Sequence, residues 1–252
     1  MREVLTEKLW QLILADCEEQ GQEIIWDRPL VGFSDARDPY FSKLRELIRP
    51  DHHLPQDFLP EARTVMSWFL PFLPEIEKSN RGGDLPSREW AEGYIVTNAM
   101  AARVNEKLCA WIREIPEQDA AVPFDAGMLG KEIPWSLWSQ RHIARLAGLG
   151  TFGLNNMLIT EKGCVGRCFS IVTTLSVEPG VPVEEERCLY KRDGSCGVCI
   201  RNCPVQALTE SGFDRYRCME RLNQNEAKHS PASVCGKCLV GLPCSHKNPI
   251  RK

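Results

Sequence analysis

The chain has 252 residues, of which 43% are hydrophobic, and a net charge of −3. This length allows one large domain or a domain with a small appendage, and the small charge gives no global attraction to nucleic acid or anionic lipid. The sequence contains no apolar run of about 18 residues, and its N-terminus lacks the apolar core of a signal peptide. We therefore expect no membrane span and a cytoplasmic location.

Periodic patterns mark several elements in chain order. Helical spacing of apolar residues predicts helices within 4–18, 90–114 and 135–150, the last ending at a glycine C-cap. Residues 62–74 are typical of a buried strand, and 155–163 and 168–177 indicate two strands joined by a turn. The proline-rich, acidic segment 177–186 predicts a linker, with a domain boundary near residue 184.

The twelve cysteines are unevenly placed, and eight of them fall between Cys188 and Cys244. In a chain of this length without a signal peptide, metal or redox use is favoured over disulfides. The run Cys196-x2-Cys199-x3-Cys203-Pro204 matches most of the ligand run of two-cluster ferredoxins. Eight thiols are the number that two 4Fe–4S clusters require.

The spacing of these cysteines predicts which ones share a cluster. A C-x2-C turn wraps the chain around one cluster, with backbone N–H groups directed at its sulfides, and Pro204 is suited to begin a helix. In two-cluster ferredoxins the last cysteine of each run binds the other cluster. The predicted ligands are Cys188, Cys196, Cys199 and Cys244 for one cluster, and Cys203, Cys218, Cys235 and Cys238 for the other.

Alternatives to this ligand assignment remain. Cys188 stands further back than the usual first cysteine, so either an insertion ends at a turn residue, Asp193, or Asp193 is itself an oxygen ligand. His246 is an alternative to the last thiolate. The competing interpretation is one zinc ion on Cys196, Cys199, Cys235 and Cys238, which leaves four cysteines without a role.

A glycine-rich loop, A-G-L-G-T-F-G-L-N-N-M-L-I-T over 147–160, follows the third helix and precedes a strand, the reverse of a dinucleotide-binding fingerprint. Together with A-R-T-V-M-S-W-F-L-P-F before it and the cysteines after it, this loop resembles the epoxyqueuosine reductases and their cobalamin-dependent relatives, including reductive dehalogenases. The resemblance covers roughly residues 60–245. It implies an α+β chain, with a nitroreductase-like α/β domain that holds cobalamin over 1–184 and a ferredoxin-like domain with two 4Fe–4S clusters over 185–252.

The resemblance further implies an oxidoreductase whose clusters pass low-potential electrons to cobalamin, supplied by a donor of the ferredoxin or flavodoxin type. Flavin is the alternative cofactor. Carried over by position, the residues that would line the cofactor are Leu149, Gly150, Thr151, Phe152, Gly153, Leu154, Asn155, Asn156, Met157, Arg167 and Ser170. The glycines would let the backbone approach the corrin. Asn155 and Asn156 either hydrogen-bond its amides or serve the turn.

The match fails where the tRNA-modifying relatives carry an acidic proton donor. That position, 13 residues before Ala147, is Pro134 here. The candidate proton donors are therefore Tyr94, Asp125 and His142, although helix packing is the simpler interpretation of Tyr94 and His142. Cys164 and Cys168, beside the same loop, are either buried cysteines without a role or residues with a redox or substrate-contact role.

The missing donor supports a second hypothesis, an electron-transfer protein that reduces the corrinoid or flavin of a partner. Only eight residues follow Cys244, so we expect no additional RNA-binding domain, although tRNA remains a candidate partner. Residues 185–252 carry 12 Lys and Arg and 7 Asp and Glu, a balance of +5, which leaves −8 for 1–184. This positive charge either neutralises two anionic clusters locally or forms a docking face for RNA or an acidic partner.

Overall fold

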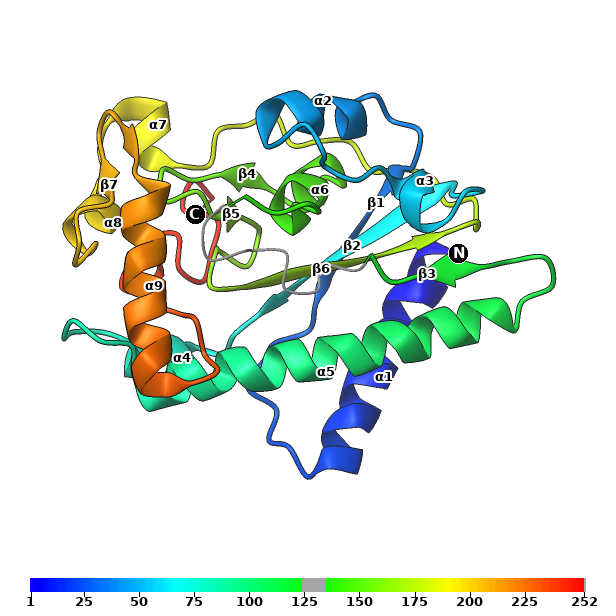
Figure 1. Ribbon diagram of the computed structural model, residues 1–252, viewed down its shortest axis with the longest axis horizontal. Coiled ribbons are helices and arrows are strands. Elements are labelled where there is room, and N and C mark those ends of the chain that lie inside the picture. The colour runs from blue at the N-terminus through cyan, green and yellow to red at the C-terminus, as the bar shows by residue number, and fades with distance from the viewer. Residues whose placement is uncertain (124–134, 252) are drawn as a thin grey trace.

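The computed structural model describes residues 1–123 and 135–251. A four-stranded antiparallel sheet lies at its centre (Figure 1), in the order β1 (Leu30–Asp35), β2 (Thr64–Pro71), β6 (Gly166–Thr173) and β3 (Ala120–Ala121). The buried strand predicted within 62–74 is confirmed as β2, of which every residue is buried. The chain is thus a mixed helix-and-sheet protein, as expected.

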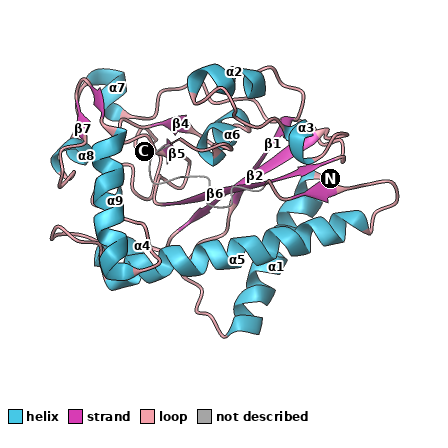
Figure 2. Ribbon diagram, in the orientation of Figure 1, coloured by secondary structure: helices cyan, strands magenta, loops and turns pink. Residues whose placement is uncertain are grey.

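Helices cover both faces of this sheet (Figure 2). The long helices α1 (Arg2–Gln20) and α5 (Arg88–Arg113) lie on one face, and α2 (Tyr40–Leu47) and α6 (Gln140–Leu146) on the other. Because side chains alternate along a strand, Met66 and Trp68 of β2 pack into the core that α1 and α5 share, whereas Val65 packs into the core beneath α2 and α6. The helices predicted within 4–18 and 90–114 are confirmed.

The C-terminal part follows a segment without helix or strand and consists of short elements. They are α7 (Leu189–Asp193), α8 (Val198–Arg201), the two-stranded sheet of β7 (Leu208–Thr209) and β8 (Gly212–Phe213), α9 (Arg215–His229) and the 3-10 turn η1 (Lys237–Leu239). Apolar residues of this part, Leu208, Leu239 and Leu242 among them, join the core of α1 and α5. The C-terminal segment therefore packs directly against the sheet-containing part.

Two predictions around the glycine loop are wrong in detail. The third helix begins at Gln140 rather than near 135, with Ser139 at its N-cap, and Gly148 follows it in a left-handed conformation with φ of 81°. The two strands expected at 155–163 and 168–177 do not pair with each other. Instead β5 (Leu158–Ile159) pairs with β4 (Thr151–Phe152) in a separate small sheet, because the glycine loop folds back on itself.

Two further short helices are α3 (Pro55–Phe58) and α4 (Pro74–Ser79), and α4 precedes the N-terminal end of α5. Within residues 1–123 and 135–251, no helix is both long enough and apolar enough to cross a membrane.

Candidate functional site

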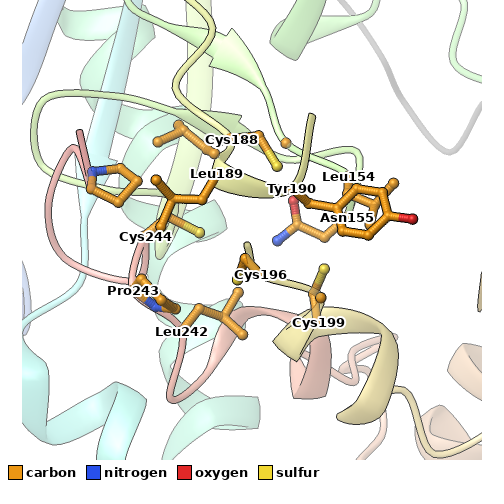
Figure 3. A pocket seen from close by; sticks show the side chains of 14 residues that line it. Leu154, Asn155, Cys188, Leu189, Tyr190, Cys196, Cys199, Leu242, Pro243 and Cys244 are labelled. Atoms are coloured by element: carbon orange, nitrogen blue, oxygen red, sulfur yellow. The ribbon is translucent and has the colours of Figure 1, made fainter. Parts of the chain in front are cut away.

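Four cysteines surround one pocket, and they are the first predicted set: Cys188, Cys196, Cys199 and Cys244. Figure 3 shows their side chains around the same space. The remaining wall is largely apolar, with Leu154, Leu189 and Leu242 among its residues. Burial, together with the neighbouring Cys188, Cys244 and Cys196, raises the pKa of Cys199 to about 11. A raised pKa means that forming the thiolate in this pocket costs free energy. Binding of the thiolate to a cationic metal centre removes that cost, so this pocket suits a metal cluster.

The residues before this pocket form a helical turn rather than a loose insertion. Helix α7 begins directly after Cys188, and Gly194 ends it in a left-handed conformation. Asp193 is exposed, and its Oδ1 accepts a hydrogen bond of 2.9 Å from the backbone N–H of Ser195. Asp193 is therefore a turn residue, not a ligand. His246, the other alternative, lies with Nε2 3.8 Å from buried Glu77 and does not line the pocket.

The second predicted set also gathers in one place. Burial raises the pKa of Cys218 to about 11, with a contribution from Cys235 and Cys203, which lie close enough to act on it. The pKa of Cys238 is raised in the same way, by burial and then by Cys235, Cys218 and Cys203. Cys199 of the first set contributes as well, so the two sets are neighbours. The structure thus brings Cys203, Cys218, Cys235 and Cys238 near one another and near Cys199, and the division of the eight thiols into two ligand sets stays a prediction.

This grouping does not favour a single zinc ion. The four cysteines of the zinc interpretation divide between the two sets, two in each. Within the described part of the chain, no three His, Cys, Asp or Glu side chains are arranged around one ion. Thiolates at the corners of a cluster, by contrast, stand further apart than thiolates around one metal.

Residues of the sheet-containing part hold the second set in position. Asn80 donates to the carbonyl of Cys235 at 2.9 Å, and the buried Lys237 donates through Nζ to the carbonyls of Asn80 and Gly82 at 2.8 and 2.7 Å. Sequence reasoning missed these contacts. Lys237 stands between two cysteines as an ordinary charged residue, and no local signal shows that it is buried.

A ninth thiol, Cys164, contacts the first set at Cys244. The backbone N–H of Cys164 donates to the carbonyl of Cys244 at 2.9 Å, and the two sulfurs lie 3.9 Å apart. The pKa of Cys164 is raised well above its usual value, first by the hydrogen bond to Cys244 and then by burial, so Cys164 stays a thiol and donates to Cys244. Asn155 reaches the other set, because its Nδ2 donates to the carbonyl of Cys238 at 3.0 Å.

The glycines of the loop make room for the chain itself. A Cβ on Gly150 would lie 2.2 Å from the carbonyl oxygen of Ile159, and one on Gly153 would lie 2.7 Å from Oδ1 of Asn155. Asn155 Oδ1 also accepts from the backbone N–H of Met157 at 3.2 Å, and Asn156 has a positive φ of 58°. Turn chemistry therefore occupies Oδ1 of Asn155 and sets the backbone of Asn156.

The other residues expected to line a cofactor divide into two groups. Leu149, Thr151 and Ser170 are buried, and Ser170 Oγ is occupied by Trp138 Nε1 at 2.9 Å and Gln140 at 2.8 Å. Partly exposed side chains belong to Phe152, Leu154, Asn156, Met157 and Arg167. Only this second group has surface to offer a ligand.

The candidate proton donors have different environments. Tyr94 of α5 faces Arg167 of β6, whose guanidinium carbon lies 4.4 Å from the ring centroid. Burial, assisted by the charge of Arg141, lowers the pKa of His142 to about 4, so the imidazole is neutral near pH 7. Neutral imidazole is a poor acid, which disfavours His142. Asp125 lies outside the described residues.

The curated proteins that resemble this chain in sequence are epoxyqueuosine reductases. No protein-family model matches the chain. An epoxyqueuosine reductase of Bacillus anthracis is 26% identical over 217 residues, which are 83% of this chain and 50% of that protein. The chain spans about half the length of the curated relatives it matches.

Solved structures share the fold. An epoxyqueuosine reductase crystallised with an epoxyqueuosine-modified tRNA stem loop has a TM-score of 0.56 and 20% identity, over 94% of this chain and 66% of that one. A catabolic reductive dehalogenase in complex with 3-bromo-4-hydroxybenzoic acid has a TM-score of 0.57 and 15% identity, over 88% of this chain and 30% of that one. The chain is therefore a relative of the epoxyqueuosine reductases in sequence and in fold, and shares that fold with reductive dehalogenases.

Proposed function

We propose that this chain is an iron–sulfur oxidoreductase of the epoxyqueuosine reductase type, with two 4Fe–4S clusters and a bound cobalamin. The observation that carries the proposal is the gathering of eight thiols into two adjacent groups of four. In this proposal residues 1–184 form a nitroreductase-like domain that holds cobalamin, and residues 185–252 form a ferredoxin-like domain that holds the clusters.

The donor set fits iron–sulfur clusters. All eight ligands are thiols, which suit iron, and the first pocket is mainly apolar. Backbone amides reach the sulfurs, since the N–H of Ala207 donates to Cys203 Sγ at 3.2 Å. Hydrogen bonds of this kind stabilise the anionic ligand and raise the potential of a cluster.

The surface beside the first pocket fits a large, partly apolar cofactor. Phe152, Leu154 and Met157 would contact its apolar faces, and Asn156 would meet its polar edge. Leu154 also lines the pocket of the first cysteine set, so the same loop would contact both the cofactor and a cluster. When bound, the clusters carry low-potential electrons and the cobalamin delivers them to the substrate.

The chain's own contribution to such a reduction is a proton. Tyr94 is the described candidate that we propose for this role, because its phenol carries an O–H group that can be donated. The Arg167 guanidinium above the ring would stabilise the phenolate that remains. Tyr94 would thus take the role of the carboxylic acid whose sequence position is Pro134 here.

A second candidate function is electron transfer to the corrinoid or flavin of a partner protein. The proline at the donor position favours it, because proline cannot transfer a proton. Both functions need a low-potential donor of the ferredoxin or flavodoxin type. A tRNA substrate is proposed only by analogy with the relative that binds the modified stem loop.

Titration of the cluster-loaded protein with cobalamin, under anaerobic conditions, tests the proposal. We expect saturable binding and, after addition of a low-potential reductant, loss of the oxidised cobalamin spectrum faster than in a mixture lacking the protein. Turnover of epoxyqueuosine in a tRNA stem loop then separates the enzyme from the electron-transfer protein. If neither cobalamin nor flavin binds, the proposal that this chain is an enzyme is refuted.

A further inference from the structure

A buried lysine stands inside the cysteine turn of the second set. Lys237 lies between Cys235 and Cys238 and is only 4% exposed. Its Nζ donates to the carbonyls of Asn80 and Gly82 at 2.8 and 2.7 Å. Carbonyl oxygens only accept hydrogen bonds and an ammonium group only donates them, so both contacts suit the charged form of the side chain. The loop between α4 and α5 therefore holds a positive charge against the turn that carries two predicted ligands.

A second cation binds the same loop from another element. Arg221 of α9 donates through Nη2 to the carbonyl of Asp84. Three carbonyls of this loop thus accept hydrogen bonds from the two cations. In the opposite direction, Asn80 donates through Nδ2 to the carbonyl of Cys235 at 2.9 Å. The loop between α4 and α5 therefore binds both the two cations and the cysteine turn beside them.

Both charges act on a thiol of the second set. Burial raises the pKa of Cys235, and a hydrogen bond from the backbone N–H of Lys237 and the positive charges of Arg221 and Lys237 oppose that rise. Burial lowers the pKa of Lys237, and the anionic form of Cys235 opposes this change before Asp84 does. Asp84 is exposed, so water and salt screen its carboxylate. The charged lysine and an anionic sulfur at Cys235 therefore favour one another.

A cluster in this position needs such charges when it is reduced. A 4Fe–4S cluster with four thiolates carries a charge of about −2, and the uptake of one electron makes it about −3 without forming or breaking a bond. Burial raises the pKa of Cys218 and Cys238, so added negative charge is disfavoured throughout the second set. A buried cation opposes this effect, because it attracts the reduced cluster more strongly than the oxidised one and is little screened by solvent.

We propose that Lys237, assisted by Arg221, raises the reduction potential of the cluster on the second set, so that a donor of the ferredoxin or flavodoxin type can reduce it. This inference rests on the proposed function, since it requires a cluster on that set. Both cations belong to residues 185–252, whose charge balance is +5, and they give the local neutralisation of a cluster a specific place. The loop between α4 and α5 is then part of the redox site, because its carbonyls hold both charges.

A redox titration monitored by EPR, on the anaerobically reconstituted protein, tests this without any turnover. The signal of the second set is the one that Cys218→Ser abolishes. Lys237→Met removes the charge and keeps a long side chain, so at a fixed solution potential the ratio of reduced to oxidised second cluster should fall about tenfold, or about 59 mV for a one-electron couple. Lys237→Arg keeps the charge and should shift the potential less. The control is Lys43→Met, which makes the same change of charge at an exposed position of α2 and should move neither potential.

Two further variants separate charge from structure. Arg221→Gln removes the other charge outside the cysteine turn, and a shift in the same direction is expected even where Lys237→Met fails to load the second cluster. Asn80→Ala removes the hydrogen bond to the carbonyl of Cys235 without a change of charge. An equal shift in Asn80→Ala or in Lys43→Met, or unchanged potentials in both charge variants, would overturn the inference. A protein that binds no iron would remove the proposed function, whereas about eight irons with unchanged potentials would remove this inference alone.

Discussion

Gly236→Ala is expected to remove one cluster and leave the other in place. Gly236 lies between Cys235 and Cys238, has φ of 72°, and a Cβ there would lie 2.3 Å from the ring of buried Trp90. The left-handed conformation costs a residue with a Cβ about 1–2 kcal/mol. Overpacking against a ring fixed in the core adds about 1–3 kcal/mol. The loop must therefore shift, and it carries two ligands of the second set.

Gly241→Ala is a matched control for this variant. Gly241 has a similar φ of 68°, but a Cβ there would meet no atom within 4 Å. Gly241→Ala therefore has the conformational cost but no overpacking. Without clusters, Gly236→Ala should have a free energy of unfolding about 1–3 kcal/mol lower than that of Gly241→Ala. After anaerobic reconstitution we expect about four irons per chain in Gly236→Ala and about eight in Gly241→Ala. Equal iron content in both variants would refute this reasoning.

Three further outcomes are expected. Cys164→Ala should keep all eight irons but lower the reduction potential of the cluster that Cys244 binds, because the S–H donor to Cys244 is lost. A redox titration monitored by EPR measures this potential, with Cys109→Ala as the control variant. An unchanged potential in Cys164→Ala would contradict the prediction. Tyr94→Phe should reduce substrate turnover by about 10²–10⁴-fold while cobalamin affinity is unchanged, and full activity would exclude the phenol as donor. The His142 pKa of about 4 lies below its unfolded value, so the unfolded chain binds the proton first. Stability should then fall between about pH 6.5 and 4, and His142→Asn should flatten that decline in acid-unfolding curves.

Part of the cysteine grouping was predictable from local spacing, whereas the assignment of Cys244 to the first set came from the pattern of two-cluster ferredoxins. Cys196, Cys199 and Cys203 lie within one turn-and-helix unit, and cluster geometry dictates how such a unit must wrap. The long helices were equally visible, since the stripe through Met100 and Val104 on α5 follows from its helical period. In both cases the physical constraint acts within a few residues of chain.

The roles of the glycines were not predictable in the same way. A glycine in the sequence shows that space is needed, but not what fills it. At Gly150 the occupant is the carbonyl of Ile159, and the short β4–β5 pairing that results is too brief to leave a pattern.

The most direct test of the central claim is the iron content of ligand variants prepared anaerobically. Two clusters on separate sets predict about eight irons in the parent protein and about four in each of Cys188→Ser and Cys218→Ser. The EPR signal that remains in Cys188→Ser should be the one that is lost in Cys218→Ser. A colourless protein with one zinc ion, or a single signal that both substitutions abolish, would contradict the account.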